Sequence, residues 1–220
     1  MTELTTIRER GSYAVGVGIG GNLQKGGIEF DPEIFLRGLM DVLSGNKLLI
    51  SGEELRVALA ALKEETTKKK EAEHKALGDE NKKQGDAFLA ANKIKEGIIT
   101  LPNGLQYKII KQGTGPKPVI SDNIQCNYRG TLIDGTEFDS SDKQGEPGIF
   151  SVNRVIEGWA EILRLMPVGS KYEVFVPANL AYGENSPIPA IGPNSTLIFD
   201  IELLSILDEQ ILDQQTRDQQ

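Results

Sequence analysis

The sequence offers no convincing nucleophile, general base or metal site, because cysteine and histidine are almost absent from it. The 220 residues include one cysteine, Cys126, and one histidine, His74. Cys126 lies in the middle of an expected strand with no histidine near it in sequence, so we expect a buried, unreactive thiol. His74 stands among charged residues of an expected helix, and no cluster of cysteines and histidines predicts a zinc site. We therefore expect neither a metal nor a cofactor.

A glycine-rich segment near the N-terminus invites a nucleotide-binding interpretation. Gly16 to Gly21 reads GVGIGG and fits G-x-G-x-x-G, and Asp41 follows at about the spacing of 20 residues that the dinucleotide motif has. That motif requires a buried strand before it and a parallel strand after it. Polar residues precede these glycines instead, so we interpret them as positions where a partner helix can approach closely. The net charge of −8 also argues against nucleic-acid binding, which uses a basic face.

Aromatic and small residues form five short motifs in the second half of the chain. They are YRGTLIDGTEFDSS from Tyr128, VIEGW from Val155, MPVGS from Met166, PANLAYG from Pro177 and IGPNSTLIF from Ile191. In this order and spacing they resemble the signature of the FKBP-type peptidyl-prolyl cis/trans isomerases. Three motifs in the first half, DPE at Asp31, LSG at Leu43 and LPNGLQY at Leu101, are similar to the bacterial Mip-like (macrophage infectivity potentiator) subgroup.

The resemblance implies an enzyme that accelerates rotation about X-Pro bonds in an aromatic pocket. Carried over residue by residue, catalytic roles fall on Phe138, Asp139, Trp159 and Tyr182, and substrate contacts on Tyr128, Phe150, Val155, Ile156, Ile191 and Phe199. Trp159 would lie under the proline ring, Tyr182 would donate to a substrate carbonyl, and Asp139 would either polarise the site or hold its loop. The resemblance also implies unfolded or proline-containing polypeptides as clients and rapamycin-type macrolides as inhibitors.

The expected chemistry needs no proton transfer. The barrier of about 18–20 kcal/mol to rotation comes from amide resonance, which the twisted amide loses. The twisted amide is less polar, so an apolar, water-free site favours it over the planar form. Two other functions stay open from the sequence: a module that uses the pocket mainly as a chaperone or adaptor, and a purely structural dimeric scaffold.

Alternating apolar residues predict an antiparallel sheet with one wet face over residues 97–207. The strands are expected near 105–109, 124–128, 171–176 and 196–201, and a short helix at 158–166 would cover the apolar face. The fold class is therefore α+β, with an FKBP-like sheet wrapped on a short helix. Residues 208–220 are expected to form a polar tail.

The first half of the chain is expected to be all-helical. In residues 1–50, Asp31-Pro32-Glu33 begins one helix that ends at Ser44, and a shorter helix spans Tyr13 to Gln24. Two short apolar helices bury little surface alone, so this module is expected to form a homodimer. Ser51 and Glu54 form a capping box that opens a stalk helix over residues 51–96. That helix is polar on nearly all sides and is expected to be a spacer with little burial, the alternative being a disordered charged linker.

The N-terminal residues show no apolar segment typical of a signal peptide, and no apolar run is long enough to span a membrane. A cytoplasmic location is expected from this pattern. The alternative is a periplasmic or outer-membrane-associated protein whose signal peptide was removed.

Overall fold

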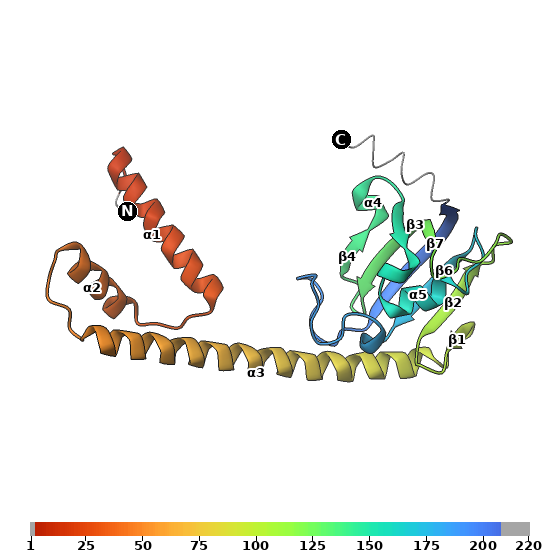
Figure 1. Ribbon diagram of the computed structural model, residues 1–220, viewed down its shortest axis with the longest axis horizontal. Helices are drawn as coiled ribbons and strands as arrows, with labels where there is room; N and C mark the ends of the chain where they lie inside the picture. Colours follow the sequence, from red (N-terminus) through yellow and green to blue (C-terminus); the bar gives the residue numbers. More distant parts are fainter. Residues whose placement is uncertain (1–2, 208–220) are drawn as a thin grey trace. The chain divides into compact units, whose positions relative to one another are not determined.

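The computed structural model describes residues 3–207, and the chain divides into two compact units, Met1–His74 and Lys75–Gln220 (Figure 1). The first unit contains α1 (Ile7–Gly26), α2 (Pro32–Leu43) and the beginning of α3 (Gly52–Asn92). The second contains the rest of α3 and the sheet. The expected order of helices followed by an antiparallel sheet is confirmed, and with it the α+β fold class.

Side-chain caps set where these helices begin. The Asp31 carboxylate accepts from the backbone N–H groups of Glu33 and Ile34 at 2.8 and 3.2 Å, which starts α2 where the sequence predicts. The Ser51–Glu54 capping box is formed in both directions at the start of α3. A further capping box at Thr6 starts α1 before Tyr13, so this helix is longer than expected.

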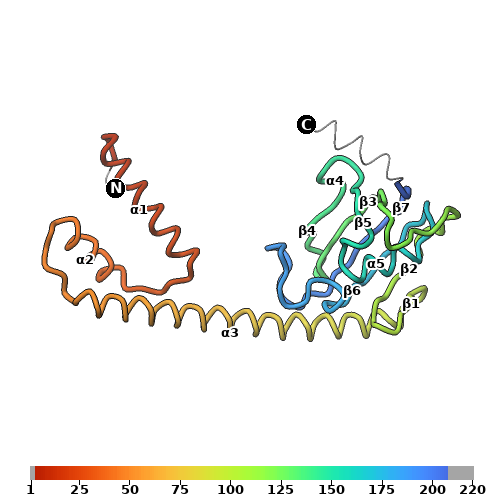
Figure 2. The backbone as a smooth tube through the Cα atoms, viewed as in Figure 1, coloured from red at the N-terminus to blue at the C-terminus, as the bar shows by residue number. Residues whose placement is uncertain are grey.

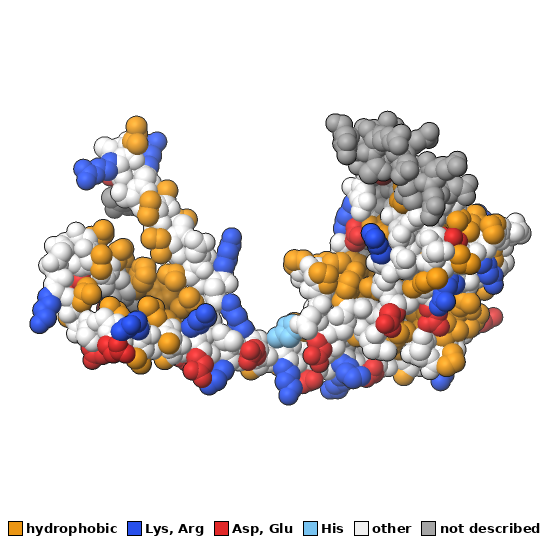
Figure 3. All heavy atoms as spheres, in the orientation of Figure 1, with side chains coloured by type: hydrophobic (Ala, Val, Ile, Leu, Met, Phe, Trp, Pro, Cys, Tyr) orange, Lys and Arg blue, Asp and Glu red, His pale blue; other side chains and the backbone are white. Residues whose placement is uncertain are grey.

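The apolar side chains of the first unit are largely exposed. None of the described residues of α1 is buried, and Ile7, Leu43 and Leu49 are 92%, 72% and 71% exposed. Figure 3 shows hydrophobic side chains gathered over α1, α2 and the start of α3. Gly16 to Gly21 lie inside α1, and none of the described residues before them, from residue 3 on, is in a strand, so the context that a dinucleotide site requires is not formed.

Seven antiparallel strands form the sheet of the second unit. They are β1 (Ile98–Thr100), β2 (Gln106–Lys111), β3 (Asn123–Leu132), β4 (Glu137–Ser140), β5 (Gly148–Ser151), β6 (Lys171–Val176) and β7 (Leu197–Leu207). Their order is β1-β2-β6-β7-β3-β4, and β5 pairs with the first half of β3. Two short helices, α4 (Ser141–Gln144) and α5 (Glu157–Leu163), and 3-10 turns at Val152–Arg154 and Ala178–Leu180 complete the unit.

The core lies between α5 and one face of the sheet. Trp159, Ile162 and Leu163 of α5 pack in one cluster with inward side chains of β3, β6 and β7. Residues of β3 alternate between buried and less buried positions, as one wet face requires. Cys126 is fully buried in this cluster, and burial raises the pKa of its thiol to about 12, as expected for an unreactive cysteine.

The C-terminal part of α3 is packed rather than being a bare spacer. Gly78, Gly85, Leu89 and Asn92 are buried. The Asn92 amide donates to the Gln106 side chain at 3.0 Å, and the Gln106 amide donates to the Leu89 carbonyl at 2.9 Å. Two of these four positions are glycines, so the helix face that packs has too little apolar character to stand out in the sequence. The expected tail, residues 208–220, lies outside the described residues.

Candidate functional site

A cavity of about 230 Å³ lies beside α5. Every predicted site residue except Ile191 lines it, and Ile191 is buried in the adjoining core at 5% exposure. Arg154 and Ile188 line it as well, although the sequence analysis singled out neither residue. The full lining consists of Tyr128, Phe138, Asp139, Phe150, Arg154, Val155, Ile156, Trp159, Tyr182, Ile188 and Phe199.

Trp159 is the centre of the aromatic lining. Its ring centroid lies 5.7 Å from that of Tyr128 and 5.3 Å from those of Phe150 and Phe199. All three contacts are edge-to-face, the arrangement that aromatic quadrupoles favour. The indole is only 4% exposed, and among the described residues its buried Nε1 has no hydrogen-bond partner. The floor of the cavity is therefore rigid and apolar.

Two strand glycines let aromatic rings lie directly against the backbone. A Cβ on Gly130 would lie 2.6 Å from the Phe138 ring and 3.0 Å from the Phe199 ring. A Cβ on Gly148 would similarly lie 2.5 Å from the ring of Phe150. Distances this short are not tolerated. Glycine at these two positions therefore allows the aromatic rings to lie against the backbone of the strands, where a larger residue would push them into the cavity.

A short hydrogen-bonded chain supplies the polar edge of the cavity. The Tyr128 hydroxyl donates to Asp139 Oδ2 at 2.8 Å, and Gln144 Nε2 donates to the Tyr128 hydroxyl at 3.0 Å. Burial raises the pKa of Tyr128, and the hydrogen bond to Asp139 raises it further. Burial and the Asp139 charge also raise the pKa of Tyr182. Both phenols thus stay protonated and able to donate at neutral pH.

Gln144 was missed by sequence reasoning because its contact depends on a helix of only four residues. Ser140 caps α4 by accepting from the Lys143 N–H, and Ser141 bonds to both the N–H and the carbonyl of Tyr128. The paired serines after Asp139 were a weak signal of this turn. They place Gln144 over the Tyr128 hydroxyl.

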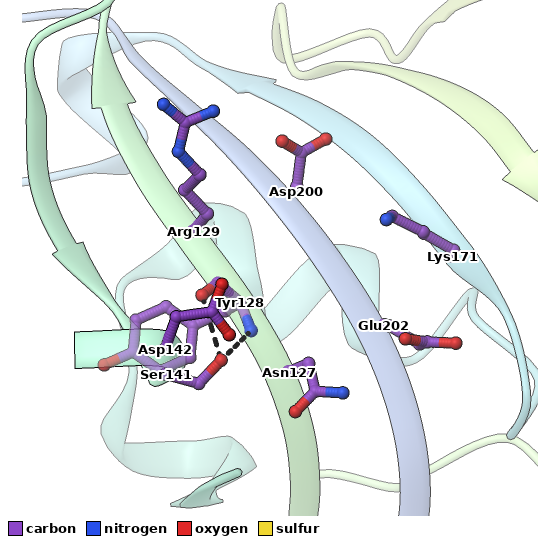
Figure 4. Close-up of a pocket in the computed structure, with 8 residues that line it drawn as sticks. All are labelled: Asn127, Tyr128, Arg129, Ser141, Asp142, Lys171, Asp200 and Glu202. Carbon is purple, nitrogen blue, oxygen red and sulfur yellow. Dashed lines mark hydrogen bonds between the residues drawn. The ribbon is translucent and has the colours of Figure 1, made fainter. Parts of the chain in front are cut away.

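A second cavity, of about 300 Å³, lies on the opposite, polar face of the sheet. Figure 4 shows Arg129 and Asp200 projecting from neighbouring strands β3 and β7, with Lys171 and Glu202 further along. Arg129 is already paired with Glu137 at 2.7 Å, and acids and bases are mixed in the lining. Tyr128 is the one aromatic residue in the lining of this second cavity, whose other residues are polar or charged, with no uniform charge to present to a ligand.

Neither a candidate metal site nor a candidate membrane-spanning helix is found in the described part of the chain. Residues 3–207 hold no group of three or more histidine, cysteine or acidic side chains placed to bind a metal ion. No helix among them is long and apolar enough to cross a membrane.

Models of two protein families match this chain. The domain amino terminal to FKBP-type peptidyl-prolyl isomerase matches residues 8–109, and the FKBP-type peptidyl-prolyl cis-trans isomerase matches residues 115–204. The second match covers the whole aromatic cavity.

Proteins similar to this chain over nearly its full length belong to the same family of isomerases or carry related names. The outer membrane protein MIP of Legionella longbeachae is 49% identical over 205 residues, which are 93% of this chain and 88% of the relative. An FKBP-type 22 kDa peptidyl-prolyl cis-trans isomerase of Escherichia coli is 41% identical, over 92% of this chain and 97% of the relative. The crystal structure of FkpA from Escherichia coli superposes with a TM-score of 0.74 at 32% identity, covering 93% of this chain and 98% of that one. The chain therefore belongs to the FKBP-type peptidyl-prolyl cis-trans isomerases, in the Mip-like group that the sequence motifs predict.

Proposed function

We propose that the aromatic cavity is where the enzyme isomerises X-Pro bonds, and that it acts by favouring the twisted amide. The observation that carries this proposal is the buried Trp159 ring with three aromatic neighbours, an apolar floor large enough to take a proline ring. A planar amide loses favourable hydration in such a site, and the less polar twisted amide loses less. Each reduction of about 1.4 kcal/mol in the barrier accelerates rotation tenfold.

The polar groups at the cavity edge would orient the substrate. Tyr182, whose raised pKa keeps it protonated, would donate to a substrate carbonyl. Asp139 accepts from the Tyr128 hydroxyl, so its Oδ2 is held in one place on the cavity wall. In this role Asp139 would polarise the site and hold its loop together, and no residue need exchange a proton with the substrate.

A peptide assay tests the proposal. The full chain should accelerate cis-to-trans conversion of an Ala-Leu-Pro-Phe peptide, and a rapamycin-type macrolide should block this and change the fluorescence of Trp159, the only tryptophan. Tyr182→Phe should lower kcat/KM by about two- to tenfold, the equivalent of one net hydrogen bond. Asp139→Leu should lower it by more, because the Tyr128 hydroxyl would lose its acceptor. Wild-type activity in both variants would refute the site.

The pH dependence tests the mechanism. Carboxyl, phenol and guanidinium groups ordinarily titrate outside pH 6–8, and both cavity tyrosines have their pKa values moved upward, further from that window. A raised phenol pKa preserves the neutral, donating form to higher pH, so kcat/KM should be nearly flat from about pH 6 to 8. NMR exchange spectroscopy measures this without a coupling protease. A bell-shaped profile in that range would indicate an acid–base pair instead.

We further propose that the first unit pairs two copies of the chain and that the dimer acts as a chaperone for unfolded clients. The exposed apolar side chains of α1 and α2 support pairing, because isolated surfaces of this kind are uncommon on monomers. Two linked pockets would hold one unfolded polypeptide more strongly than a single pocket does. A purely structural scaffold is disfavoured by the intact aromatic cavity.

We also propose an envelope location, in place of the cytoplasmic one expected from the sequence. The Legionella relative is named an outer membrane protein, and this favours the periplasmic or outer-membrane-associated alternative.

A further inference from the structure

One residue of the cavity lining, Ile188, belongs to a loop that we call the rim loop, residues 183–196. Ile188 of this loop and Tyr182 just before it both line the cavity. The Asn194 N–H donates to the Gly183 carbonyl at 2.7 Å and closes the base of the loop. Near its tip, Ile191 N–H donates to the Ile188 carbonyl at 3.0 Å. The loop contains no helix or strand that could hold these side chains in place by itself.

The base of the rim loop is attached to α3. Asn81 Nδ2 donates to the Pro193 carbonyl at 2.8 Å, and Pro193 is buried. One helical turn away on either side, glycines allow close packing. A Cβ on Gly78 would lie 3.2 Å from Asn194 Nδ2, and a Cβ on Gly85 would lie 2.3 Å from Thr196 Oγ1. Figure 2 shows this loop running beside the C-terminal part of α3.

The hydrogen bond from Asn81 is a directional contact in this packing. A part-buried carbonyl that loses its donor is destabilised, so we expect the backbone at Pro193 to move toward another partner. Asn194 next to it has φ of 53°, in the left-handed region that few residues tolerate. The same residue bonds to Gly183, adjacent to Tyr182. A shift at Pro193 is therefore passed on to the cavity wall within a few residues.

We propose that Asn81 is a positioning residue for the isomerase: by holding Pro193 it fixes the rim loop, and with it Tyr182 and Ile188. This inference rests on the proposed catalytic role of the aromatic cavity. Under this proposal Asn81 of α3 does not touch the substrate, yet it helps to hold the site in its active arrangement. Preorganisation of groups that contact the substrate affects binding of the substrate and of the twisted state together.

Three variants of the full chain test this proposal. Asn81→Ala removes the donor, and Asn81→Asp keeps the size of the side chain but cannot donate when ionised. Lys83→Ala is the matched control, because Lys83 is exposed on the same helix two residues away. Both Asn81 variants should lower kcat/KM on the Ala-Leu-Pro-Phe peptide by about fivefold, a loss on the scale of one hydrogen bond, mainly through a higher KM. Lys83→Ala should equal wild type.

A structural readout accompanies the kinetics. In ¹H–¹⁵N spectra, the amide signals of Tyr182 and Ile188 should shift in both Asn81 variants and stay in place in Lys83→Ala. Unchanged KM and unchanged signals in Asn81→Ala would overturn the proposal, as would a lower melting temperature with wild-type KM. An Asn81→Asp variant that behaves as wild type would also overturn it, because shape and not donation would then matter. An inactive wild type would refute the proposed function alone, since the amide signals would still report the position of the loop.

Discussion

Replacing Trp159 with alanine is expected to abolish measurable isomerase activity and to destabilise the second unit by about 3–5 kcal/mol, the range for large-to-small aromatic changes in a core. The indole is 4% exposed and packs edge-to-face against Tyr128, Phe150 and Phe199. Each such pair contributes about 0.5–1.5 kcal/mol beyond burial. Its removal would leave a void under the proline site and free the neighbouring rings to turn into it.

The matched variant is Trp159→Phe, which keeps an aromatic floor of smaller area. It should retain part of the activity and most of the stability, so that the two variants separate loss of the site from loss of the fold. Both must be assayed well below their melting temperatures, measured by circular dichroism. An active, stable Trp159→Ala protein would remove Trp159 from the proposed mechanism.

The second large effect is expected on removing residues 1–74. Without the exposed apolar surface of α1 and α2, the fragment that begins at Lys75 should be a monomer in light scattering, whereas the full chain should be a dimer. The fragment keeps every residue that lines the cavity, so its kcat/KM on a short peptide should stay close to that of the full chain. On a protein whose refolding is limited by proline isomerisation it should lose at least about tenfold, because linking two sites that engage one client strengthens binding by about 100- to 10,000-fold.

A shorter fragment beginning at Gly97 is the control for α3. It lacks Leu89 and Asn92, which complete the hydrogen bonds of the buried Gln106 side chain. A buried polar group left unpaired costs about 1–3 kcal/mol, so this fragment should melt lower and bind the peptide more weakly than the Lys75 fragment. Equal refolding activity of the full chain and the Lys75 fragment would leave the first unit without a chaperone role. A monomeric full chain would contradict the proposed dimer.

Sequence reasoning was most reliable where one local interaction decides the outcome. Asp31 before Pro32 and Ser51 before Glu54 predict helix starts because a cap satisfies backbone donors within three residues. The long strands β3, β6 and β7 show alternation over enough positions to be recognised. The cavity residues were predicted through motif resemblance, and the structure brings all but Ile191 to one lining.

Features that depend on distant contacts were not predictable in this way. Strands β1, β4 and β5 have three or four residues each, too few for a period of two to stand out. Gln144 reaches the Tyr128 hydroxyl only because α4 folds back over β3. The burial of α3 against the rim loop depends on glycines, which carry no hydrophobic signal, and on one asparagine that is polar by type.

The single cysteine of this enzyme is expected to be unreactive toward thiol reagents while the protein is folded. Cys126 is fully buried, and its pKa of about 12 keeps the thiol protonated, so neither oxidants nor alkylating reagents find a thiolate in the folded protein. Two copies of the chain cannot be joined by an adventitious disulfide without unfolding. A cysteine introduced at an exposed position of the rim loop would therefore be the sole reactive thiol, and a spin label or fluorophore could be attached there without first mutating the native residue.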